Sequence, residues 1–371
     1  MDKADLDRLL VMLDELDGSD LHLKAGAPPR MRVAGALRVL DDEAAFTAEE
    51  TLEVAESMMS PSVLETFKQH HEADFAYSLS GTGRFRVNAY YQRSSVALAM
   101  RRVRAHASTA SELGLPEVVN RLSEEQRGLV LVTGPTGSGK TTSLAAMIDH
   151  INHLRSCHVV TIEDPVEYLH TDDLAAIDQR EVGFDTDSFS SAMRVVLRQD
   201  PDVILVGEMR DMETVSAALT AAETGHLVFS TLHTINSTET VNRIVDFFPP
   251  HQQSQVRISL AGSLKGIICQ RLIPAADGVR RVPALEILVV NGRIQQAIVD
   301  PLLTADIGEI VADGEYYGMM TFDQSLVGLI ASGTITLAEA MATASNPHDL
   351  KVMLERTGIM QTGQLASATF A

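Results

Sequence analysis

The sequence predicts an α/β protein in which a parallel, doubly wound sheet follows a smaller antiparallel α+β unit and precedes a set of helices. Three observations predict this class. Four short apolar runs between residues 128 and 231 are separated by enough chain for crossover helices. A glycine-rich stretch joins the first of these runs to a helical pattern. The 371 residues, 45% of them hydrophobic, are enough for two domains.

The first hundred residues predict the smaller unit. Leucines recur at helical spacing from Leu6 to Leu16, so residues 3–16 predict a helix that ends before Gly18. Residues 48–69 return to helical spacing. Extended segments are predicted at 20–24, 29–33 and 36–40, and three strands at 73–79, 84–91 and 96–103. This pattern is typical of a mixed unit with an antiparallel sheet.

The second part of the chain predicts the parallel sheet. Residues 105–114 are expected to be a linker between a domain at 1–104 and a domain at 115–356, and the small, polar residues 357–371 a flexible tail. The four apolar runs predicted as parallel strands are 128–133, 158–162, 203–206 and 227–231. Helices are predicted at 237–247 and 250–263, a hairpin within 266–287, and further helices to Arg356.

A phosphate-binding loop is predicted at residues 134–141, GPTGSGKT, directly after the first apolar run. Its glycines let backbone N–H groups converge at the start of the next helix, where the dipole favours anions. Lys140 would then reach the β- and γ-phosphates, and Thr141 would place its hydroxyl on Mg²⁺. A chance glycine-rich turn is the alternative, and the flanking strand and helix disfavour it. The residues predicted to bind ATP are Gly134, Pro135, Thr136, Gly137, Ser138, Gly139, Lys140, Thr141 and Thr142.

Acidic residues follow two other predicted strands. Glu163 and Asp164 come directly after the second strand, where either carboxylate could orient and deprotonate a water that attacks the γ-phosphate. Glu208 follows the third strand and has the place of the acid that holds Mg²⁺. Gly207 stands where many ATPases have Asp, which favours a contact through water. The alternatives are solvated loop acids at 163–164 and, for Glu208, a cap of the following helix.

Histidine and arginine residues complete the candidate set. His233 ends the fourth strand, beside the predicted γ-phosphate position, and could sense the nucleotide state, whereas His226 before that strand is expected to be structural. In the smaller unit, residues 81–102 carry a concentration of arginines, including Arg86 and Arg101. They either pair with surface carboxylates or reach the γ-phosphate as arginine fingers.

The composition limits the classes of partner. A net charge of −20 and a pI near 4.9 disfavour nonspecific binding of nucleic acid or of an anionic lipid surface. The two cysteines, Cys157 and Cys269, cannot form a disulfide framework or a cysteine-based zinc site, which indicates a reduced, cytosolic protein. No stretch approaches the about 20 apolar residues of a membrane span, so no direct membrane insertion is expected.

Four segments together resemble the secretion and pilus ATPase superfamily. They read GPTGSGKTT, TIEDPVEY, LRQDPDVILVGEMRD and GHLVFSTLHT, and they correspond to its Walker A, Asp box, Walker B and His box. The further segments RFRVNAYYQ, GSLKGIICQRLIP, MMTFDQSLVGLI and ASNPHDLKVML are similar to those of the type IV pilus retraction ATPases, the PilT group. The resemblance covers nearly the whole chain.

The resemblance implies a PAS-like N-terminal domain and a RecA-like ATPase domain in a hexameric ring. The ring would lie in the cytoplasm, at the inner face of the membrane, on an inner-membrane pilus platform protein and with a second pilus ATPase as an optional partner. Carried over to this sequence, Glu163 is the catalytic base, Glu208 supports the metal and His233 is the His-box sensor. Arg86 and Arg101 correspond to arginines that complete the ATP site when the N-terminal domain closes.

The resemblance favours retraction over assembly. Assembly-type relatives usually carry a longer N-terminal region and four zinc-binding cysteines after the His box, where this sequence has Cys269 alone. One departure concerns residues 291–298, which read NGRIQQAI where the retraction group has AIRNLIRE. The alternatives are an assembly or secretion ATPase, an accessory retraction ATPase that depends on a partner motor, a nonhydrolytic switch and a nucleic-acid translocase. The two acids argue against the switch, and the net charge argues against the translocase.

Overall fold

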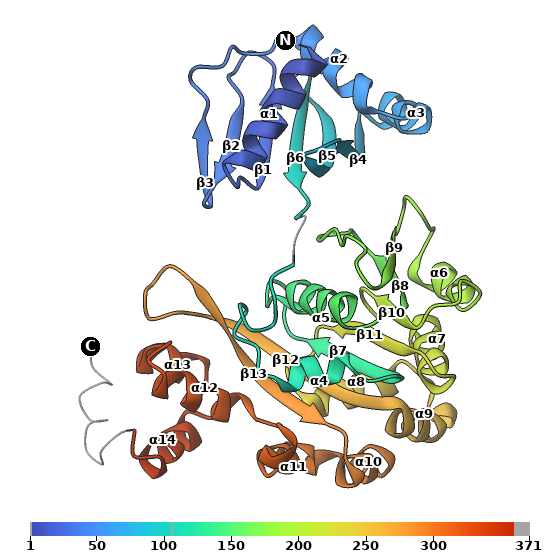
Figure 1. Ribbon diagram of the computed structural model, residues 1–371, viewed down its shortest axis with the longest axis vertical. Helices are drawn as coiled ribbons and strands as arrows, with labels where there is room; N and C mark the ends of the chain where they lie inside the picture. The colour runs from blue at the N-terminus through green and yellow to red at the C-terminus, as the bar shows by residue number, and fades with distance from the viewer. Residues whose placement is uncertain (1, 105–106, 360–371) are drawn as a thin grey trace. The chain divides into compact units, whose positions relative to one another are not determined.

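The computed structural model describes residues 2–104 and 107–359 (Figure 1). Most of the predicted tail, from residue 360 on, lies outside the described residues, as does the start of the predicted linker at 105–106. The chain folds into two compact units. Unit 1 comprises residues 1–106 and 167–169, and unit 2 comprises residues 107–166 and 170–371.

Unit 1 is built on a six-stranded antiparallel sheet in the order β3-β2-β1-β6-β5-β4. Its strands are β1 (Asp20–Lys24), β2 (Arg30–Val33), β3 (Ala36–Val39), β4 (Glu72–Leu79), β5 (Gly83–Gln92) and β6 (Ser95–Arg102). Helix α1 (Lys3–Glu15) packs on this sheet through four fully buried leucines at positions 6, 9, 10 and 13. The predicted antiparallel α+β unit is confirmed.

The segment predicted to have helical spacing, residues 48–69, is helical with one break. Residues 48–69 form two helices, α2 (Ala48–Met58) and α3 (Pro61–His70). The break is local, because Met59 is extended, Ser60 caps α3 by accepting from the Val63 amide, and Pro61 occupies the first turn of that helix. The helical spacing of the apolar residues did not indicate this break.

Unit 2 contains a seven-stranded sheet in the order β13-β12-β7-β11-β10-β8-β9, parallel except for the β12–β13 pair (Figure 1). The strands are β7 (Gly128–Thr133), β8 (His158–Glu163), β9 (Ala176–Glu181), β10 (Val203–Val206), β11 (Leu227–Leu232), β12 (Leu264–Pro274) and β13 (Arg281–Val289). The four predicted parallel strands and the hairpin are confirmed. Strand β9 was not predicted, because its sequence AIDQRE is an edge strand without an apolar run.

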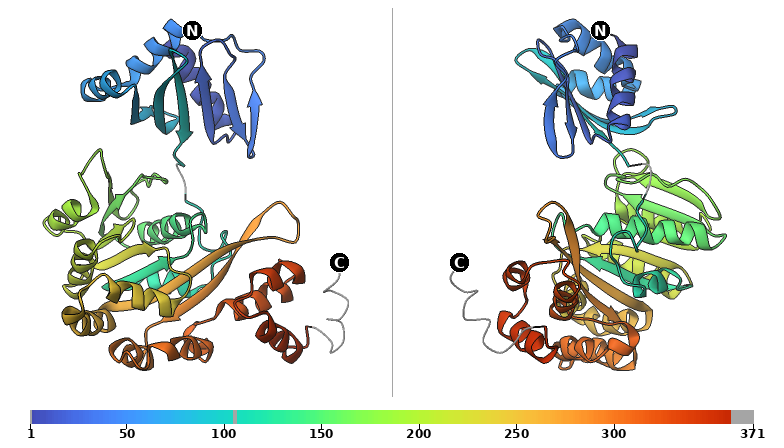
Figure 2. Two further views of the ribbon diagram at one scale, coloured as in Figure 1. Left: turned by 180° about the vertical axis from the view of Figure 1, so that it is seen from behind. Right: turned by 60° about the vertical axis from the view of Figure 1, so that its left-hand side comes forward.

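Helices cover both faces of this sheet, as Figure 2 shows from two further sides. Along β7, Leu129 and Leu131 face one hydrophobic core and Val130 and Val132 face the other. One core contains α4 (Val118–Ser123) and α5 (Lys140–Leu154), and the other contains α6 (Phe189–Val196), α7 (Met212–Glu223), α8 (Ser237–Asp246) and α9 (Pro250–Ser263). This is the predicted doubly wound arrangement.

The chain after β13 is helical, as predicted. It forms α10 (Gly292–Val299), the 3₁₀ turn η1 (Thr304–Asp306), α11 (Ile307–Ala312), a second 3₁₀ turn η2 (Glu315–Tyr317), α12 (Phe322–Ala331), α13 (Leu337–Thr343) and α14 (Pro347–Arg356). These helices add Ile294, Phe322, Leu350 and other residues to the core on the α7 side of the sheet. No helix among the described residues is long and apolar enough to cross a membrane.

Candidate functional site

The glycine-rich loop connects the end of β7 to the start of α5, as predicted. Gly134 has a φ of 143°, and a Cβ there would lie 2.2 Å from the carbonyl oxygen of Gln270 on β12. Gly139 has a φ of 90°, and a Cβ there would lie 2.8 Å from the Gln270 Nε2. Gly134 faces backbone that cannot move aside, so it requires glycine for close approach as well as for backbone conformation. Gly139 faces the end of a side chain that can shift, so it requires glycine for its positive φ.

The loop fits a polyphosphate. Lys140 Nζ donates to the carbonyl oxygens of Gly134, at 2.8 Å, and Pro135, at 3.1 Å, so its ammonium group is held over the loop. The Ser138 Oγ is buried and has no hydrogen-bond partner among the residues that the structure describes. The first turn of α5 carries no acidic residue to compete with an anion. Pro135 and Thr136 are exposed, whereas Thr141 and Thr142 are half-buried on that first turn.

The two candidate bases after β8 lie in different environments. Glu163 is the last residue of β8 and is 8% exposed. Its Oε1 accepts hydrogen bonds from Thr161 Oγ1, at 2.6 Å, and from Gln179 Nε2 on β9, at 3.2 Å. Asp164 is exposed and pairs with Arg210 Nη1 at 3.5 Å. Glu163 is therefore the oriented carboxylate of the two.

Glu208 lies after β10 and connects two further site residues. Its Oε2 accepts from Arg210 Nε at 2.9 Å, and its Oε1 lies 3.2 Å from His233 Nε2. The hydrogen bond to Glu208 raises the pKa of Arg210 above its usual value. Glu208 does not cap the following helix, because the N-cap of α7 is Asp211, which accepts from the Thr214 amide. The structure thus excludes the capping alternative for Glu208.

The two histidines of the His box, His226 and His233, lie in different environments. His233 lies just after β11, with half of its side chain exposed, and contacts Glu208. The His226 Nδ1 lies 3.0 Å from the carbonyl oxygen of Ala221, in the last turn of α7. His226 therefore closes the C-terminal end of a helix, which is a structural role.

The candidate arginines belong to unit 1. Arg86 on β5 and Arg101 on β6 are direct neighbours in the antiparallel register. Arg101 Nε donates to Asp20 Oδ1 at 2.9 Å, whereas Arg86 is exposed and has no ion-pair partner among the described residues. The ion-pairing alternative thus holds for Arg101.

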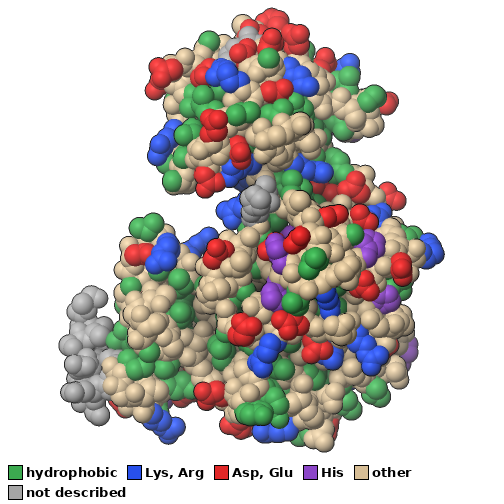
Figure 3. Space-filling view, in the orientation of Figure 1, with side chains coloured by type: hydrophobic (Ala, Val, Ile, Leu, Met, Phe, Trp, Pro, Cys, Tyr) green, Lys and Arg blue, Asp and Glu red, His purple; other side chains and the backbone are tan. Residues whose placement is uncertain are grey.

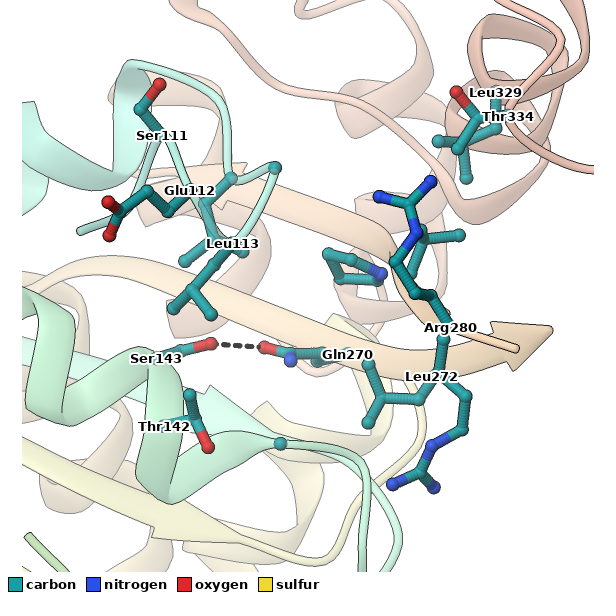
Figure 4. Close-up of a pocket in the computed structure, with 16 residues that line it drawn as sticks. Ser111, Glu112, Leu113, Thr142, Ser143, Gln270, Leu272, Arg280, Leu329 and Thr334 are labelled. Atoms are coloured by element: carbon teal, nitrogen blue, oxygen red, sulfur yellow. Dashed lines mark hydrogen bonds between the residues drawn. The ribbon is translucent and has the colours of Figure 1, made fainter. Parts of the chain in front are cut away.

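A cavity of about 700 Å³ adjoins the phosphate loop in unit 2. Figure 4 shows its walls: Leu113 and Glu112 from the segment before α4, Thr142 and Ser143 from α5, and Gln270, Leu272 and Arg280 from the β12–β13 hairpin. The dashed line marks a hydrogen bond from Ser143 Oγ to Gln270 Oε1, 2.8 Å long. Walls that combine leucines with polar and charged side chains beside a phosphate loop suit the nucleoside part of a nucleotide, which has an apolar ring face and polar edges.

Sequence reasoning missed several residues of the site. Arg210 was visible in the segment GEMRD, two positions after Glu208, but it was not singled out. Gln179 lies on the unpredicted strand β9, opposite Thr161 in the parallel register, and no sequence signal points to it. Gln270 occurs in a segment used only for the family resemblance. Its contact with the phosphate loop depends on the pairing of β12 with β7.

A strand, glycine loop and helix at the carboxyl edge of a doubly wound sheet, followed by an oriented carboxylate at the next strand, define the class of P-loop ATPases. The comparisons with known proteins make this more specific. Residues 75–310 match the family described as type II/IV secretion system protein. The chain belongs to this family and, within it, to the PilT group of pilus ATPases, which makes it an ATP-hydrolysing enzyme.

Three relatives show how far the similarity extends. The type IV pilus retraction ATPase PilT of Pseudomonas aeruginosa is 42% identical over 345 residues, which cover 93% of this chain and 99% of the relative. The type IV pilus ATPase PilU of the same organism is 39% identical over 365 residues, covering 98% and 95%. A crystal structure of the pilus retraction motor PilT with bound ADP has a TM-score of 0.85 at 46% identity, covering 94% of this chain and 99% of that one.

Proposed function

We propose that this chain is a motor that retracts type IV pili by hydrolysing ATP, with Glu163 as the general base. The observation that carries the catalytic assignment is the orientation of Glu163 at the end of β8. Thr161 and Gln179 both donate to one of its oxygens, Oε1, at 2.6 and 3.2 Å. The fixed carboxylate accepts a proton from the water that attacks the γ-phosphate.

The other residues of unit 2 have distinct roles in this proposal. Residues 134–142 hold the phosphates through backbone N–H groups, and Lys140 turns from the loop carbonyls to the β- and γ-phosphates when they bind. Thr141 and, through water, Glu208 would hold a Mg²⁺ ion, which neutralises charge on the phosphates when bound. His233 follows the state of this site through its contact with Glu208.

We propose further that Arg86 and Arg101 reach the γ-phosphate region when the N-terminal domain, residues 1–104, closes on the ATPase domain at 115–356. Phosphate release then permits reopening, and this cycle performs mechanical work in a homo-hexameric ring. The ring is proposed to act in the cytoplasm, on an inner-membrane platform protein of the pilus machine, through which pilin subunits return to the membrane. No nucleic acid is expected as a partner. On the face drawn in Figure 3, Lys and Arg side chains are interspersed with Asp and Glu, which supports this expectation.

The test of the catalytic proposal is Glu163→Gln. This variant keeps the size of the side chain and one oxygen that can accept from Thr161 and Gln179, but it cannot accept the proton at neutral pH. ATP and ADP should bind within about twofold of wild type, whereas steady-state turnover should fall at least a hundredfold. Asp164→Asn is the matched control, since it changes the neighbouring exposed carboxylate. Normal turnover in the Glu163 variant, or loss of turnover only in the Asp164 variant, would reverse the assignment.

A second candidate function is an accessory retraction ATPase that depends on a partner motor. It is favoured by the segment 291–298, which forms most of α10 and departs from the retraction pattern. Surface pili should accumulate in a strain that lacks this chain if it retracts pili, and should be lost if it assembles them. An accessory role is supported if the chain restores retraction only in cells that also contain a second pilus ATPase.

A further inference from the structure

Gln270 is a buried residue whose side-chain amide nitrogen has no hydrogen-bond partner among the described residues. It lies on β12, 3% exposed, in the wall of the cavity beside the phosphate loop. Its Oε1 accepts a hydrogen bond from Ser143 Oγ at 2.8 Å. Its Nε2 donates no hydrogen bond to any residue in the described parts of the chain. The nitrogen is not among the fully buried polar atoms that lack a partner, so it is accessible and can donate to an acceptor from outside the protein.

The carboxamide is held in place. The bond from Ser143 fixes the oxygen toward α5, which leaves the nitrogen as the remaining side-chain donor of a residue that lines the cavity. The nitrogen also lies 2.8 Å from the position that a Cβ of Gly139 would occupy, so the loop backbone passes directly beside it. Such a fixed donor between the loop and the cavity suits a ligand that extends from one into the other.

We propose that Gln270 contacts the bound nucleotide directly, donating a hydrogen bond from Nε2 to an acceptor of the nucleoside, and so discriminates a nucleotide from a bare polyphosphate. This inference rests on the proposed placement of the nucleoside in the cavity. The base and the ribose both offer nitrogen or oxygen acceptors. Tripolyphosphate has neither a base nor a ribose. Leu113 and Leu272 supply apolar surface for the base in the same cavity.

A purely positioning role makes a different prediction. The Gln270 backbone carbonyl packs against Gly134, and its side chain bonds Ser143, so the residue also supports the loop. If support were its whole role, replacing the side chain would weaken every ligand of the loop, with or without a nucleoside. A direct contact weakens only ligands that contain a nucleoside.

The experiment is calorimetric titration of the full chain with ADP and with tripolyphosphate, for wild type, Gln270→Met and Ser143→Ala. We expect Gln270→Met to weaken ADP binding about threefold to tenfold, the value of one neutral hydrogen bond, and to leave tripolyphosphate within about twofold. Ser143→Ala removes the bond that orients the carboxamide but keeps Nε2, so its ADP affinity should fall less than that of Gln270→Met, again with tripolyphosphate within about twofold. Gln270→Asn, which keeps a carboxamide but draws it back by one methylene, should show the same selective loss.

Two results would overturn the proposal. Equal weakening of ADP and tripolyphosphate in the Gln270 variants would reduce the residue to a support of the loop, and unchanged ADP affinity would remove the contact altogether. Because binding is measured without turnover, these results are independent of Glu163. A wild-type chain that binds ADP but fails to retract pili would refute the proposed function and leave the assignment of Gln270 in place.

Discussion

Of the two neighbouring arginines of unit 1, Arg86 and Arg101, only Arg101 forms an ion pair with Asp20. Its carboxylate is almost fully buried, accepts from Arg101 at 2.9 Å and lies 3.4 Å from Arg32 on β2. Burial alone would raise the pKa of Asp20, but hydrogen bonds from Ser19 and Arg101 outweigh it and lower the pKa below its usual value. Arg101 thus stabilises unit 1 whatever else it does, whereas the structure gives Arg86 no such role.

The lowered pKa predicts how Asp20→Asn depends on pH. A carboxyl group with a depressed folded pKa contributes stability above its unfolded pKa, about 3.9, and loses it as the pH falls through the folded value. The variant should therefore cost about 1.5 kcal/mol throughout pH 6 to 8, with the difference shrinking below about pH 4. Hydrogen exchange of the β1 and β6 amides should become about tenfold faster at pH 7. Arg86→Ala is the control, and equal acceleration in both variants would contradict the argument.

At the scale of elements, the phosphate loop depends on a strand that enters the sheet from far along the chain. Strand β12 pairs in parallel with β7, with Cys269 opposite Thr133, and this register places Gln270 against the loop. The carbonyl oxygen of Gln270 and the Ser138 side chain both lie within 2.7 Å of a Cβ at Gly134. The conformation of the phosphate loop thus depends on packing against β12 as well as on its own glycines.

This packing predicts different effects for two glycine substitutions. Gly134→Ala places a methyl group against the backbone of β12 and should weaken ADP binding at least tenfold more than Gly137→Ala. Gly137 also has a positive φ, 77°, but a Cβ there meets nothing within 4 Å, so its variant carries only the conformational penalty. Calorimetric ADP titration measures the difference, with circular dichroism to confirm that both variants are folded. Equal affinities would show that β12 does not constrain the loop.

The same elements show which parts of the structure the sequence could predict. Strands β7, β8, β10 and β11 are fully buried or nearly so, and each is a continuous apolar run, so their positions and their carboxyl-edge residues were predictable. Strand β9 is a polar edge strand that forms by pairing with β8, so it was not predicted. Gln179, which lies on it, was therefore not predicted as a site residue. Gln270 and Arg210 could not be assigned because their roles arise from contacts, not from spacing.

At the scale of the whole molecule, the proposed motor needs residues from both units at one site. The phosphate loop, Glu163 and Glu208 belong to unit 2, and Arg86 and Arg101 belong to unit 1. In a ring, each active site could take its arginine from its own chain or from the neighbouring chain. These two arrangements give different results when variants are mixed, because subunits with complementary defects can restore a site only across an interface.

The final prediction concerns ATPase activity as a function of assembly. The specific activity of the wild-type chain should rise with its concentration, and Arg86→Ala should lower turnover at least a hundredfold at every concentration while ADP affinity stays unchanged, as for an arginine finger. Mixing Arg86→Ala with Glu163→Gln then distinguishes the arrangements. If Arg86 acts on the neighbouring subunit, interfaces that join an intact Glu163 to an intact Arg86 recover part of the wild-type rate. If it acts within its own chain, every site in the mixture lacks one group and no activity returns. Wild-type turnover in Arg86→Ala alone would remove this arginine from the mechanism and leave Arg101 as the remaining candidate from unit 1.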